Sequence, residues 1–90
     1  MRYFEDIELG EVWELGERPV DENEIMAFAA HYDPMPCHCE AVAAKESYFG
    51  SLTASSWHVN AMAMGLLTNS FKAQGLVSLG SPGINRCRWF

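Results

Sequence analysis

The sequence predicts an α+β domain in which a curved sheet wraps one long buried helix. Residues 57–67 are apolar on almost every side, which is typical of a helix with no solvent face. Short strand-like segments at 11–15, 76–79 and 84–90 would supply the sheet that covers it. The 90 residues suffice for one domain, and a composition of 49% hydrophobic and 20% charged residues favours a globular core.

The first half of the chain predicts a strand and then a capped helix. Apolar and polar residues alternate only partly over 11–15, and Gly16 interrupts the pattern, so we expect an edge strand with a bend. Asp21 followed by Glu24 has the spacing of a capping box, with the acid three residues after the cap. A helix over 22–30 is therefore predicted.

Two further helices are expected in the second half. Residues 40–46 are rich in alanine, which favours a short helix. Ser55 or Ser56 can cap the long helix, which we expect to stop at Gly75. Because glycine weakens a helix, Gly65 indicates a close approach between this helix and a strand.

Charge and cysteine content exclude several classes of function. A net charge of −6 with six scattered basic residues argues against a nucleic-acid partner. No apolar run is long enough to span a bilayer, so no membrane association is expected. The N-terminus lacks the apolar core of a secretory signal, and three cysteines do not suggest a disulfide framework. We therefore expect a cytoplasmic protein.

The most chemically suggestive stretch is the proline-stiffened segment 31–38. Pro34 and Pro36 each fix one backbone dihedral and push the preceding residue out of the helical region, so a helix cannot run through. Asp33 and His38 are thereby held on a short, stiff loop, where a carboxylate and an imidazole can share one water or one proton. The plainer alternative is an aspartate that ends a helix and a histidine that merely follows it.

Other candidate ligands are interpreted as structural. His31 and His58 are expected to serve the fold, although His58 could line a site at the start of the long helix. The Cys37-His38-Cys39 cluster lacks the second pair of ligands that a structural zinc site needs, so no metal is predicted.

Four segments together resemble a known family. They are Tyr3-Phe4-Glu5-Asp6 with Gly10-Glu11, the stretch from Phe28 to His38, Phe49-Gly50 with Ala54-Ser55-Ser56-Trp57-His58, and Gly80-Ser81-Pro82-Gly83-Ile84 with Arg88-Trp89. In this order they resemble the MaoC-like dehydratases, which include the R-specific enoyl-CoA hydratases of the hot-dog fold. The hydratase motif of that family is matched by Asp33, Pro36 and His38.

The resemblance implies a long helix wrapped by an antiparallel sheet, with two such units paired as a homodimer. An acyl-CoA thioester would lie in a tunnel between them, and coenzyme A would be part of the substrate rather than a separate cofactor. Asp33 and His38 would activate a water for syn addition to the enoyl double bond. Ser55, Ser56 and Trp57, at the start of the long helix, would bind the thioester oxygen; Ser56 stands where the family has glycine. Met35 also departs, because hydratases of the family often have asparagine there.

Two other functions remain compatible with the same residues. A hot-dog acyl-CoA thioesterase would direct the water at the carbonyl carbon instead of the β-carbon. A truncated, non-catalytic subunit would only bind acyl groups or pair with a partner. Since family domains continue with further strands, residues 1–90 are expected to be the N-terminal part of a single hot-dog domain, with doubtful activity alone.

Overall fold

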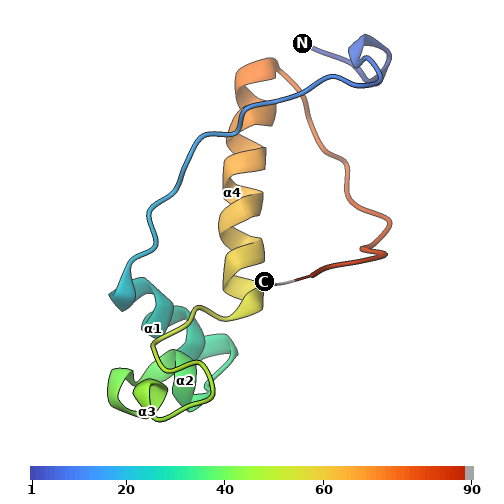
Figure 1. Ribbon diagram of the computed structural model, residues 1–90. Coiled ribbons are helices and arrows are strands. Elements are labelled where there is room, and N and C mark those ends of the chain that lie inside the picture. Colours follow the sequence, from blue (N-terminus) through green and yellow to red (C-terminus); the bar gives the residue numbers. More distant parts are fainter. Residues whose placement is uncertain (89–90) are drawn as a thin grey trace. The chain divides into compact units, whose positions relative to one another are not determined.

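The computed structural model describes residues 1–88, and every regular element in that range is helical (Figure 1). The elements are the 3₁₀ turn η1 (Phe4–Asp6), α1 (Glu22–Tyr32), α2 (Pro36–Cys39), α3 (Ala41–Lys45) and α4 (Ser56–Gln74). The chain forms two compact units. One spans Arg18–Ala63, and the other combines Met1–Glu17 with the chain from Met64 onward.

The predicted α+β hot-dog fold is wrong, because residues 1–88 contain no β-strand. The segments expected as strands at 11–15 and 76–79 are irregular, as are residues 84–88 of the third; its last two residues lie outside the described range. A strand exists only where a second segment accepts and donates its backbone hydrogen bonds. None of these described segments pairs with another, so no ladder of backbone hydrogen bonds stabilises them as strands.

Helix α4 has the predicted length but not the predicted burial. Only His58 and Met62 are buried along it, while Trp57 and Met64 are mostly exposed. The space beside Gly65 is open, so the expected close approach of a strand is also wrong. No helix in the described part of the chain has the length and apolar character needed to cross a bilayer.

Helix α1 begins as predicted and ends slightly later. The Asp21 side chain accepts a hydrogen bond from the backbone N–H of Glu24 at 3.2 Å, which confirms the cap. The helix continues to Tyr32 because Pro34 restrains only Asp33, the residue directly before it. The buried side chains of this unit come from all four helices and the residue before α4: Ile25, Ala29, Cys37, Ala44, Ser55, His58 and Met62.

The proline-rich segment forms a helical turn where an extended loop was expected. Met35 is the N-cap of α2, and Pro36 occupies its first position, where a missing N–H costs nothing. The non-helical connection is therefore limited to residues 33–35, and His38 lies on α2. The prediction for residues 40–46 is confirmed as the short helix α3.

In the other unit, the end of α4 is closed by backbone hydrogen bonds. Gly75 has a φ of +71°, and the N–H of Leu76 reaches back to the carbonyl of Phe71 at 2.8 Å. This confirms Gly75 as the helix stop. The carbonyl of Gly75 accepts a 3.0 Å bond from the N–H of Arg2, and the Trp13 ring meets Phe71 edge-on at 5.9 Å. The N-terminal segment is thus joined to the end of α4.

Candidate active site

Asp33 is positioned by the end of α1. Its N–H still donates to the carbonyl of Ala29 at 2.9 Å, which makes it the C-cap of the helix. Its own carbonyl accepts from the N–H of Met35 at 2.8 Å, which closes the tight connection to α2. The backbone N–H and carbonyl of Asp33 are therefore both hydrogen-bonded, which fixes the position from which its side chain extends.

His38 is oriented by a backbone carbonyl on a distant segment. Its Nδ1 lies 2.6 Å from the carbonyl oxygen of Thr53. Because a carbonyl only accepts hydrogen bonds, this contact places a proton on Nδ1. The other ring nitrogen, Nε2, then faces Oδ2 of Asp33 at 3.6 Å. The acid and the imidazole predicted to act together do lie together in the structure.

The residue directly before α4, Ser55, contacts the Asp33 carboxylate. Its side chain is fully buried, and its hydroxyl donates a 2.7 Å hydrogen bond to Oδ2 of Asp33. The carbonyl of Ser55 accepts from the N–H of Val59, as expected of the residue that precedes a helix. The Ser55 hydroxyl therefore serves Asp33, and one carboxylate oxygen is shared between a hydroxyl and an imidazole.

This arrangement suits proton transfer better than nucleophilic attack by serine. In a hydrolase triad the serine donates to the imidazole, whereas here Ser55 donates to the carboxylate. Nε2 of His38 and Oδ2 of Asp33 are 3.6 Å apart, which is too far for a direct hydrogen bond, so both atoms can hydrogen-bond to one reactant molecule. The Asp33 and His38 side chains are 30% and 14% exposed, which leaves the pair open to a small reactant.

Ser56 and Trp57 lie in the first turn of α4. The backbone N–H groups of a helix's first turn have no acceptors within the helix, so they can receive an anionic oxygen. Trp57 is 67% exposed. The structure thus places two of the three predicted thioester-binding residues at a helix start and assigns the third, Ser55, to Asp33.

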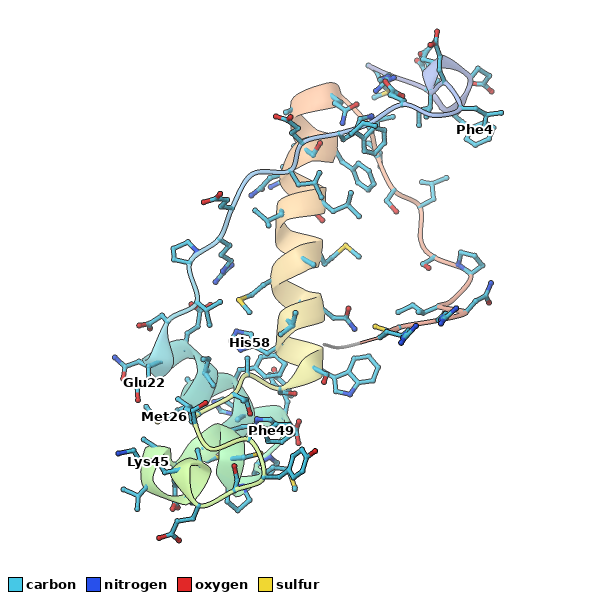
Figure 2. All side chains as sticks on the ribbon, viewed as in Figure 1. Phe4, Glu22, Met26, Lys45, Phe49 and His58 are labelled. Atoms are coloured by element: carbon cyan, nitrogen blue, oxygen red, sulfur yellow. The ribbon has the colours of Figure 1, made fainter. Side chains whose placement is uncertain are left out.

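Sequence reasoning missed Thr53. It predicted a structural His58 but not the stacking of its ring on Phe28. Thr53 acts through its backbone carbonyl, which has no signature in the residue type. His58, labelled in Figure 2, is only 4% exposed and stacks on the Phe28 ring with centroids 4.6 Å apart and planes 10° apart. His31, by contrast, is exposed on α1.

The described residues contain no group of three or more histidine, cysteine, aspartate or glutamate side chains placed to hold a metal ion. Cys37, Cys39 and Cys87 form no disulfide with one another, and Cys37 is buried. At this site the Asp33 carboxylate and the His38 imidazole are the two titratable groups that face each other.

Comparisons of the chain with protein-family models, curated proteins and solved structures found no match. Together with the all-helical structure of residues 1–88, this overturns the resemblance to the MaoC-like dehydratases. The four segments that suggested it are short, and residues 1–88 do not form the antiparallel sheet that defines the hot-dog fold.

Proposed function

We propose that Asp33 and His38 add water to, or remove it from, the double bond of a 2-enoyl-CoA thioester. The observation that carries the proposal is the shared oxygen of Asp33, which accepts from Ser55 at 2.7 Å and faces Nε2 of His38 at 3.6 Å. A carboxylate and an imidazole this close can take a proton from water on one side and deliver a proton from the same face.

The roles of the two groups follow from their hydrogen bonds. The Ser55 hydroxyl donates to Oδ2 and fixes the direction of the Asp33 carboxylate, so we assign the role of base to Asp33. It removes a proton from water as the oxygen bonds to the β-carbon and the electron pair of the double bond moves toward the thioester. Protonated His38 then gives its Nε2 proton to the α-carbon. Transfer of the proton from Asp33 to His38 restores both groups, and the net addition is one water.

The negative charge that develops on the thioester oxygen needs hydrogen-bond donors. The N–H groups of Ser56 and Trp57, at the start of α4, are suited to this task because the helix dipole favours an anion there. Coenzyme A is part of this substrate, so the reaction needs no further cofactor. We further propose that the chain acts as a homodimer in a reducing cytoplasm. The exposed apolar side chains of Val77 and Leu79 support the homodimer, and the buried, reduced thiol of Cys37 supports the compartment.

The test is to incubate the purified chain with crotonyl-CoA and follow both the enoyl absorbance and free thiol. Loss of absorbance without thiol release is expected, and Asp33→Asn or His38→Gln should reduce the rate by about a hundredfold or more. Glu40→Gln is the matched control, since Glu40 is an exposed carboxylate two residues after His38 in the sequence and should leave the rate unchanged. Thiol release would indicate a thioesterase instead, and no reaction at all would contradict an enzymatic role.

A further inference from the structure

A partly open cavity lies in the unit 18–63, between α1 and the first turns of α4. Its volume is about 330 Å³, and neither Asp33 nor His38 lines it. Phe28, Ala61 and Met62 form its apolar wall. Arg18, Glu24, His31 and His58 supply its polar groups. A cavity of this size, mostly apolar with a few convergent polar groups, is typical of a site for a small molecule.

The polar end of the cavity holds more potential cations than anions. A single oxygen of Glu24, Oε1, receives the hydrogen bond of the Arg18 guanidinium and also lies 3.9 Å from Nε2 of His58. The imidazole of His31 lines the same space. A guanidinium has five N–H donors, and the bond to Glu24 uses one nitrogen of Arg18, so it can bind a second carboxylate.

His58 provides an independent observation. Its ring is almost completely buried, yet Nδ1 has no hydrogen-bond partner. Buried polar atoms are rarely left in this state, and such exceptions call for an explanation. Nδ1 makes no bond that would hold the proton there, and the Glu24 carboxylate 3.9 Å from Nε2 favours a proton on Nε2. Nε2, on the side of Glu24, can therefore donate to an oxygen that enters the cavity.

We propose that this cavity binds a small organic carboxylate. The carboxylate of the ligand takes the place of Glu24 between Arg18 and His58, and its short chain or ring packs on Ala61 and Met62. This site is separate from the proposed hydration reaction, and its occupancy can be measured without any catalytic assay.

The experiment titrates the ¹⁵N-labelled 90-residue chain with sodium benzoate and follows the backbone amide signals. Saturable shifts are expected at Arg18, Glu24, His58 and Ala61. Benzamide has the same shape without the charge, and it should bind about tenfold more weakly or worse. Arg18→Gln should lower the benzoate affinity by a similar factor. Glu24→Gln should raise it, because the competing carboxylate is gone.

A pair of alanines tests the location. Ala61→Leu fills the cavity and should abolish the shifts, whereas Ala63→Leu changes an exposed position of the same helix outside the lining and should preserve them. Arg18→Gln and Glu24→Gln keep the proposal testable should Ala61→Leu unfold the unit. Equal binding of benzamide, tighter binding of benzylammonium, weaker benzoate binding by Glu24→Gln, or no saturable shift would each overturn the proposal.

Discussion

At the scale of single residues, one oxygen of Asp33 connects three elements. Oδ2 of this side chain, at the end of α1, meets Ser55 directly before α4 and His38 on α2. A buried hydroxyl bonded to a carboxylate contributes more than one bonded to a neutral group, because the acceptor is charged. The Ser55 hydroxyl should therefore matter both for stability and for the direction of the carboxylate.

Ser55→Ala removes this bond without changing the backbone. We expect the free energy of unfolding to fall by about 2 kcal/mol, measured by urea denaturation, because the carboxylate loses a buried donor. Ser51→Ala is the control, since Ser51 is exposed, and its effect should stay within about 0.5 kcal/mol. Equal stability of the two variants would mean that the Ser55–Asp33 bond contributes nothing.

A second residue-scale prediction concerns Glu11 in the other unit. The side-chain hydrogen bond from Arg2 lowers the pKa of Glu11 below its ordinary value of 4.5. Because the folded chain holds the charged form more firmly, this contact stabilises the N-terminal segment above pH 4.5. The stabilisation is lost as the pH falls through the lowered pKa of the folded state.

A carboxyl-carbon NMR titration of Glu11 measures this shift. Arg2→Gln should return the pKa of Glu11 toward its ordinary value, because the guanidinium is the largest cause of the shift. Glu5→Gln alters an exposed carboxylate outside this contact and should leave the titration of Glu11 unchanged. A Glu11 titration that does not respond to Arg2→Gln would disprove the contact.

At the scale of elements, α1 depends on its cap. Asp21→Ala removes the acceptor for the N–H of Glu24, and we expect it to destabilise the protein by about 1 kcal/mol. Thermal unfolding followed by circular dichroism measures the change. Asn23→Ala, in the exposed first turn, is the matched control and should be neutral or slightly stabilising, because alanine favours helices. A larger loss in Asn23→Ala than in Asp21→Ala would contradict the role of the cap.

The predicted helices were largely correct because their signals are local. Asp21 and Glu24 fix the start of α1, and Gly75 fixes the end of α4 through its positive φ. The position of α2 was missed because Pro36 both breaks a preceding helix and starts a new one. Such information lies within a few residues of each helix end, so the sequence alone was sufficient for most of it.

At the scale of the whole molecule, sequence reasoning failed where the structure depends on distant partners. Residues 11–15 and 76–79 were predicted as strands, but a strand needs a partner for its backbone hydrogen bonds, and the sequence pattern does not specify one. Asp33 and His38 were found because they are five residues apart. Their supporting contacts were not, since the Thr53 carbonyl and the Ser55 hydroxyl come from 15 and 22 residues away.

Amide hydrogen exchange tests the strand-free architecture directly. The amides of residues 12–17 and 77–81 should exchange rapidly, because they form no backbone ladder, whereas the central amides of α1 and α4 should be slower. The capped ends of the same helices serve as internal references. Slow exchange in both irregular segments would restore the case for a sheet.

The two bonds to Thr53 have one more consequence. Its N–H donates to the carbonyl of Cys37 at 3.2 Å, and its carbonyl accepts from His38, so the segment between them is closed at its base; it contains α3 and the loop that follows α3. Tyr48, which is 99% exposed, lies on this loop. Lengthening a closed loop costs only about 0.6 kcal/mol for each doubling. The chain can therefore carry an inserted reporter peptide after Tyr48 while the Asp33–His38 pair keeps its geometry.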